Sequence, residues 1–327
     1  MNLDLVKSYV EFKVEGEKKC FYNSFHTEKG NFFDHKTEKE LTALVMLNKF
    51  PSIFIPPDLK NSIDMDKVPE FEENVYKNIA KDGSFFTGIF ENTRVTVVWG
   101  DVLRLKNIFS KVKYKLEAYC VVNSTNSKME PGCGASGNIY GVGESDNKKK
   151  KENQKKLSEL NKAEGIHRKI ETGWAVSGPV TESHINLGIE EIVHAVAPNM
   201  KRPGVKKTKN VDDMKVKMYE VYFRSLLVAK SSKVAFVSMG TGIFGCDIHK
   251  TSTVALKAIK DMIKSKIREK EEIILACIGI EDFWCYIHAC LHVIDNVTKW
   301  STNVQEIKNI NHKVLKLVAN FDELKND

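Results

Sequence analysis

The sequence predicts an α/β fold in which helices cover both faces of a central sheet, giving three layers, α/β/α. Two observations predict it. Nearly continuous apolar, β-branched runs are typical of strands covered on both faces, and amphipathic helical segments alternate with them. The strand candidates are residues 95–99, 118–122, 192–196, 234–239 and 273–278.

The helices of this domain are predicted from apolar residues at helical spacing. In residues 247–267, Leu256, Ile259 and Ile263 fall on one face, as expected for a helix packed on a sheet. Residues 282–294 repeat the pattern, and residues 303–324 are predicted to form a final helix.

Residues 1–92 form a separate compositional unit, which we expect to be a small α+β or helical extension of a domain spanning residues 93–327. Residues 37–50 have helical periodicity and end at Pro51, because proline cannot continue a helix. Residues 52–57 are predicted to be extended. An accessory cap is favoured over a recognition module, since no chemistry-bearing cluster occurs here.

Composition restricts the classes of function. The 327 residues are 42% hydrophobic and carry a formal net charge of +7, which favours anionic ligands but is weaker than in most nucleic-acid-binding domains. The seven cysteines are odd in number, and several fall in apolar segments, which indicates free thiols in a reducing compartment. With no signal peptide and no membrane-spanning run, we expect a cytoplasmic or nuclear monomer.

Two lysine-rich segments, near residues 145–165 and 200–217, interrupt the alternating pattern. Solvated loops are the favoured interpretation, because neither segment interleaves aromatic residues for base stacking. Contact with a polyanion is the alternative.

Two glycine-containing loops are the most informative feature. Each follows an apolar run that is predicted to be a strand and precedes a plausible helix. The first comprises residues 121–126 and 131–137, and the second residues 236–245. Backbone N–H groups and the positive end of a helix dipole bind phosphate at such turns. Two such loops predict a nucleotide diphosphate ligand.

These loops belong to a series of motifs through which residues 93–294 resemble the macro domain family, the ADP-ribose-binding module. The motifs are residues 99–102, 121–126, 132–137, 192–198 and 240–245, with residues 172–175 also fitting. Their order and spacing carry the resemblance. It implies a mixed central sheet, no cofactor, and ADP-ribose or an ADP-ribosylated protein as partner. For the lysine-rich segments it adds poly-ADP-ribose to RNA as the alternative polyanion.

The resemblance also implies roles for individual residues. Asp101 is expected to accept a hydrogen bond from the adenine amino group, with the backbone of Val102 against the ring. Asn126 is expected to bind the distal ribose, and Asn123 to fix the loop beside it. The expected ligand-binding residues of the first loop are Asn123, Asn126, Gly132, Cys133, Gly134, Ala135, Ser136 and Gly137, and those of the second are Ser238, Gly240, Thr241, Gly242, Ile243 and Phe244.

The sequence departs from one hydrolase branch of the family. That branch carries an aspartate where this chain has Ser136, and a histidine is frequent where it has Tyr140. A serine without a partner cannot act as a base at neutral pH. Asn126 is then the one candidate for catalysis. Two functions remain as alternatives: a weak ADP-ribosylhydrolase, and a non-catalytic reader that only binds ADP-ribose.

Two further residue sets bear on metal binding and on the adenine side of the site. Cys285, His288 and His292 share a helix face, but a further ligand is missing, so no metal is expected. The residue that stacks on adenine in relatives falls near Ile278 or Phe283.

Overall fold

A computed structural model describes residues 26–27, 30–31, 83–111, 116–166, 169–201, 207–294, 297 and 301–302. The helices expected at residues 37–50 and 303–324, and the extended segment at 52–57, lie outside these residues.

The described strands form a mixed sheet of eight strands, which confirms the expected fold class. Its order is β10 (Ser301–Thr302), β3 (Phe85–Phe90), β4 (Thr93–Trp99), β9 (Glu272–Cys277), β8 (Lys233–Val237), β5 (Tyr119–Ser124), β7 (Ile189–Ala195) and β6 (Ala175–Gly178). The strands from β4 to β7 are parallel, while β10, β3 and β6 are antiparallel to their neighbours. A separate hairpin joins β1 (His26–Thr27) to β2 (Gly30–Asn31).

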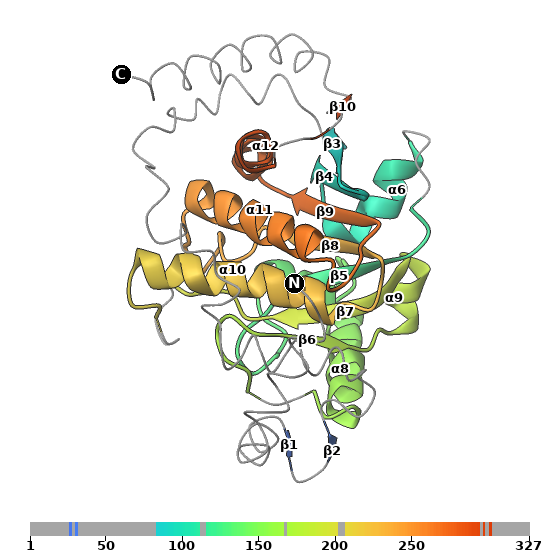
Figure 1. The fold of residues 1–327 in the computed structure, drawn as a ribbon. Helices are drawn as coiled ribbons and strands as arrows, with labels where there is room; N and C mark the ends of the chain where they lie inside the picture. The colour runs from blue at the N-terminus through green and yellow to red at the C-terminus, as the bar shows by residue number, and fades with distance from the viewer. Residues whose placement is uncertain are drawn as a thin grey trace, which may run out of the picture.

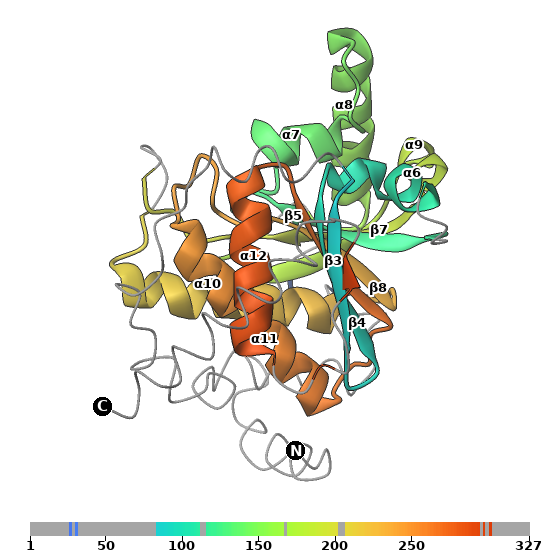
Figure 2. The same cartoon turned by 90° about the horizontal axis from the view of Figure 1, so that it is seen from above.

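Helices cover both faces of the sheet (Figure 1). Three long helices pack side by side on one face: α10 (Val211–Val228), α11 (Ile248–Ser265) and α12 (Ile280–Val293). The opposite face carries the 3-10 turn η3 (Val102–Arg104), α6 (Leu105–Ser110), α7 (Gly134–Tyr140), α8 (Asn147–Ala163) and α9 (Glu182–Asn186) (Figure 2). The three predicted layers are therefore present.

The core lies between the sheet and these helices. Val97, Val121 and Ile274, from three parallel strands, are completely buried. Burying one such side chain contributes about 1.5–3 kcal/mol, so the core fixes the strands and with them the loops at their carboxyl ends. Five of the predicted strands are found within a few residues of their expected bounds.

Two features differ from expectation. Strand β3 precedes residue 93, the expected start of the domain, and pairs along its length with β4, so the sheet begins at Phe85. The first lysine-rich segment is the helix α8 and not a loop. Asp146 caps it by accepting hydrogen bonds from the backbone N–H groups of Lys148 and Lys149, and lysine itself is a good helix former.

Part of the second lysine-rich segment is also helical, since α10 begins at Val211. Asn210 caps this helix by accepting a hydrogen bond from the Asp213 backbone N–H. Among the described helices, none has the length and apolar character needed to cross a membrane. The six described cysteines are all free thiols, and Cys133 is the exposed one among them.

Candidate ligand-binding site

A cleft opens where the parallel strands β5, β8 and β9 end. Its volume is about 270 Å³. Its walls come from the two glycine loops and from the start of α12. The lining residues are Ser124, Thr125, Asn126, Gly132, Cys133, Gly134, Ala135, Ser136, Val237, Ser238, Gly240, Thr241, Gly242, Ile243, Phe244, Ala276, Ile278 and Asp282. The two loops are separated by more than a hundred residues in sequence and face the same cleft.

The first loop is held by its own side chains. Oδ1 of Asn126 accepts hydrogen bonds from the backbone N–H groups of Lys128 at 2.9 Å and Glu130 at 3.2 Å. Its Nδ2 has no partner among the described residues, which leaves two N–H donors for a ligand. Gly134 has a φ of +65° at the first residue of α7, a conformation that glycine adopts without strain.

The second loop turns through two glycines with positive φ, Gly240 at +74° and Gly245 at +65°. Gly242, between them, has no positive φ, and a β-carbon added there would meet nothing within 4 Å. A side chain at residue 242 would therefore point into open space. Phe244 is buried, while Ile243 is half exposed at the cleft.

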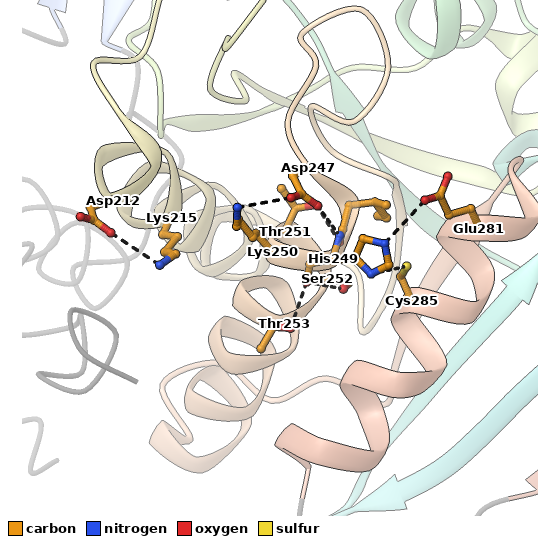
Figure 3. A network of polar contacts seen from close by, with 11 residues as sticks. Asp212, Lys215, Asp247, His249, Lys250, Thr251, Ser252, Thr253, Glu281 and Cys285 are labelled. Carbon is orange, nitrogen blue, oxygen red and sulfur yellow. Dashed lines mark hydrogen bonds and ion pairs between the residues drawn. The ribbon is translucent and has the colours of Figure 1, made fainter. Parts of the chain in front are cut away.

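The helices that follow the loop are tied together at their N-termini (Figure 3). Asp247 caps α11 by accepting a hydrogen bond from the His249 backbone N–H. The His249 ring lies between α11 and α12, with Nδ1 3.4 Å from Sγ of Cys285 and Nε2 3.6 Å from Oε1 of Glu281. Burial raises the pKa of the Cys285 thiol, so this thiol is protonated at neutral pH and acts as a packing group.

Asp282 brings a carboxyl group into the cleft. It lies in the first turn of α12, and its Oδ2 accepts a hydrogen bond from the Thr241 hydroxyl at 3.5 Å. Burial raises its pKa, the charge of Glu281 adds to this, and the hydroxyls of Ser238 and Thr241 oppose it. Sequence reasoning missed Asp282, because nothing in a helical pattern indicates that the third residue of α12 faces a loop about forty positions earlier.

A buried polar network lies behind the first loop. Nδ2 of Asn123 lies 3.4 Å from Oγ of Ser136 and 3.3 Å from Nδ1 of His194. On the other side of this ring, Nε2 lies 3.3 Å from Nδ2 of Asn161. Burial lowers the pKa of His194 to about 3, so the imidazole is neutral.

Comparison with known proteins shows what the part of the chain that holds these loops is similar to. Residues 122–255 match the family model of the macro domain. Over these residues the chain is similar to macro domains. The O-acetyl-ADP-ribose deacetylase 1 of Pantoea vagans is 24% identical over 194 residues, which cover 59% of this chain and 96% of that protein. An uncharacterized protein of Thermoplasma volcanium is 28% identical over 153 residues, which cover 45% of this chain and 70% of that protein.

Part of the chain also aligns with solved macro domains. One from Oceanobacillus iheyensis with ADP aligns with a TM-score of 0.48 at 19% identity, covering 64% of this chain and 97% of that chain. One from Trypanosoma brucei in complex with ADP-ribose aligns with a TM-score of 0.41 at 16% identity. The alignment covers 60% of this chain and 68% of that chain.

Most of the residues expected to bind ligand lie together around the cleft. Asp101, Val102, Asn123 and Gly137 are not part of its lining. Oδ1 of Asp101 accepts a hydrogen bond from the Leu103 backbone N–H at 3.0 Å, and Oδ2 accepts one from Nδ2 of Asn138 at 3.2 Å. Val102 and Asn123 are buried.

The two residues considered for the adenine side are clearly distinguished. Ile278 is 67% exposed and lines the cleft, whereas Phe283 is fully buried in the core. Of the two, Ile278 is therefore the apolar side chain that is exposed at the cleft. Among the described residues, no three His, Cys, Asp or Glu side chains are grouped to hold a metal ion.

Proposed function

We propose that the cleft binds ADP-ribose, either free or as the ADP-ribosyl group of a modified protein. The observation that carries this is the meeting of two glycine loops across one cleft, at the carboxyl ends of the neighbouring parallel strands β5 and β8. Ligands of open α/β sheets bind at this edge. The relatives named for ADP, ADP-ribose and O-acetyl-ADP-ribose support the same ligand class.

In the proposed arrangement the diphosphate lies between the two loops. Backbone N–H groups of Gly242 and Ile243 approach it from one side, and those at the start of α7 from the other. Adenine lies toward Ile278 and Asp101, and the distal ribose toward Asn126. Asp101 is prepared for this role, because a carboxylate held by a backbone N–H and an amide keeps lone pairs for an adenine amino group.

The binding experiment is calorimetry with ADP-ribose on the folded protein. We expect micromolar-order affinity, which is about −8 kcal/mol. AMP is the matched control ligand, because it carries the adenine and one phosphate but cannot reach both loops. Equal affinity for AMP and ADP-ribose, or no heat with either, would refute the proposed diphosphate site.

We further propose weak hydrolysis of an ADP-ribosyl bond, either in mono-ADP-ribosylated protein or in an ADP-ribose derivative. Asn126 is the candidate catalytic residue: its Nδ2 is available to orient the distal ribose and a water molecule that the ribose organises. Ser136 lines the cleft where the hydrolase branch has its aspartate, so no carboxylate base is supplied there. The deacetylase name of one relative supports a hydrolytic reaction.

The reaction is tested with a protein that carries labelled ADP-ribose on acidic side chains. Release of label by the wild-type protein, and much slower release by Asn126→Ala, is the expected result. A wild-type rate no greater than that of Asn126→Ala would leave a non-catalytic reader that binds and does not cleave.

The helix α8 favours a second, compatible function, which is contact with a polyanion such as poly-ADP-ribose. Most of its lysines are exposed, and the helix lies beside α7, itself part of the cleft wall (Figure 2). RNA is the alternative polyanion. The free thiols support a reducing compartment, cytoplasmic or nuclear, and we propose a monomer.

A further inference from the structure

A chain of buried side chains leads from a backbone carbonyl to the wall of the cleft. Oη of Tyr140 donates a short hydrogen bond to the carbonyl oxygen of Met129. Nδ2 of Asn161 lies 3.1 Å from the same Oη and 3.3 Å from Nε2 of His194. Beyond the ring, the Asn123 amide separates His194 from Ser136.

The direction of the hydrogen bonds is set at the Met129 end. A carbonyl oxygen can only accept, so Tyr140 donates its single proton there. Toward Asn161 the Tyr140 oxygen can then only accept, which requires the NH₂ end of that amide. The same NH₂ group points at Nε2 of His194. Nε2 is therefore the acceptor nitrogen of the ring and carries no proton.

His194 must then carry its proton on Nδ1. The ring is completely buried, and burial holds its pKa near 3, so one ring nitrogen is protonated and the other is not. Nδ1 faces the amide of Asn123 at 3.3 Å. Two donors cannot share a hydrogen bond, so the amide must present its oxygen to Nδ1.

A half-turn of the Asn123 amide about its Cβ–Cγ bond exchanges Oδ1 and Nδ2, and so meets this requirement. With Nδ2 toward the ring, Oδ1 of Asn123 is buried and has no hydrogen-bond partner among the described residues. Oδ1 of Asn161 is also buried without a partner, but Tyr140 fixes the NH₂ end of that amide. Asn123 is therefore the amide whose oxygen and nitrogen are exchanged. After the half-turn, Oδ1 lies at the position that Nδ2 occupied, between His194 and Ser136.

We infer that Oδ1 of Asn123 accepts hydrogen bonds from both Nδ1 of His194 and Oγ of Ser136, so that Ser136 presents only lone pairs to the cleft. A serine hydroxyl has one proton, and here Asn123 takes it. Ser136 is thus a specificity-determining acceptor for a ligand hydroxyl or a bound water. It supplies, without charge, the acceptor that a carboxylate supplies in the hydrolase branch. Naming the ligand group as a distal ribose hydroxyl rests on the proposed function.

The first arm of the test measures the tautomer of His194 in the unliganded protein by ring ¹⁵N–¹H NMR. His184 is an internal reference of the opposite tautomer. Its Nε2 lies 2.9 Å from the carbonyl oxygen of Ile139, to which it must donate, and its Nδ1 accepts from the Thr181 backbone N–H. We expect an Nδ1–H signal from His194 and an Nε2–H signal from His184. An Nε2–H tautomer at His194 would overturn the inference.

The second arm compares ADP-ribose with ADP, which lacks the distal ribose, on the wild-type protein and Ser136→Ala. We expect the variant to lose about five- to tenfold in affinity for ADP-ribose, as for one missing hydrogen bond, and nothing for ADP. Unchanged ADP-ribose affinity would refute the acceptor role of Ser136. Wild-type protein that binds neither nucleotide would instead refute the proposed function, and the His194 tautomer would still decide the direction of the network.

Discussion

Gly137 lies directly against the carbonyl group of Gly132: a β-carbon added at Gly137 would be 2.1 Å from that oxygen. The carbonyl closes the first loop over the start of α7, so this contact sets the position of the cleft wall. Gln154 of α8 adds to it by donating a hydrogen bond to the Gly137 carbonyl at 3.1 Å. Gly137 therefore does not line the cleft. It shapes the first loop, because the absence of a side chain lets the Gly132 carbonyl pack closely against it.

Gly137→Ala should destabilise the protein by about 1–3 kcal/mol, because the loop must move to accommodate the methyl group. Gly132→Ala is the matched control, since a β-carbon there meets its nearest neighbour at an ordinary 3.9 Å. Thermal unfolding of both variants measures the difference. Equal unfolding temperatures would show that the loop can shift without cost.

Gly242→Glu should abolish ADP-ribose binding and leave folding nearly unchanged. The new side chain has open space around it, and its carboxylate would repel the diphosphate at short range. The readout is the shift in unfolding temperature on adding ADP-ribose, which arises when only the folded state binds. A shift equal to that of the wild-type protein would place the diphosphate elsewhere.

Gly240→Ala separates loop structure from ligand repulsion in the same loop. Gly240 has a φ of +74°, and a β-carbon there would lie 3.1–3.3 Å from Met218, Cys246 and Ala197. This variant should lower stability where Gly242→Glu does not. Residue 240 thus requires glycine for its backbone conformation, whereas residue 242 requires glycine to leave space for the ligand.

The alternation of apolar strands and amphipathic helices was enough to predict the layers, because buried parallel strands have a distinctive composition. It missed β3, whose sequence from Phe85 to Phe90 includes Thr87 and Gly88 and pairs at the antiparallel side of the sheet. Buried residues alternate with more exposed ones along β3, so this strand has no continuous apolar run to identify it. The boundary expected at residue 92 therefore falls inside a hairpin.

The helix α8 was missed for a different reason. Its buried residues are Asn153, Leu157 and Asn161, at spacings of four, and two of the three are polar. A hydrophobic-periodicity argument cannot detect a helix that packs through amides. The same limit applies to Asp282, whose place in the cleft depends on the relation between α12 and the second loop.

Asp101→Ala should weaken ADP-ribose binding and also cost stability, because the side chain caps η3 at Leu103 and bonds to Asn138. Loss of a cap costs about 0.5–2 kcal/mol. Asp101→Asn keeps an oxygen for the cap but loses the charge. Calorimetry at a temperature where both variants are folded separates the two effects. ADP-ribose affinity that is unchanged in both variants would remove Asp101 from the adenine site.

Charge removal on α8 tests the polyanion surface. Replacing Lys149, Lys151 and Lys155 with alanine should weaken poly-ADP-ribose binding and flatten its dependence on salt, because fewer counterions are released. Binding of monomeric ADP-ribose should stay the same. Replacement of Lys250, Lys257 and Lys260 on α11 is the matched control for total charge. Wild-type binding that is insensitive to salt would exclude this surface, and tighter binding of RNA would identify RNA as the polyanion.

Asp282→Asn should make stability less dependent on pH. Burial raises the pKa of this carboxyl above its ordinary 3.8, so the folded state holds the proton more tightly than the unfolded state does. Stability from this group is present at low pH and is lost as pH rises through the window between the unfolded and folded pKa values. Asp282 lies in the first turn of α12, where the helix dipole favours a carboxylate, whereas burial, the largest cause of the shift, acts in the opposite direction. The amide variant cannot ionise. Its unfolding temperature should rise relative to that of the wild-type protein as the pH is taken from about 4 to about 7, and the carboxylate should no longer oppose an anionic ligand near neutral pH. A relative unfolding temperature that falls over this range would show that the ionised Asp282 is stabilised in the fold, and the cleft would then contain a favourable carboxylate.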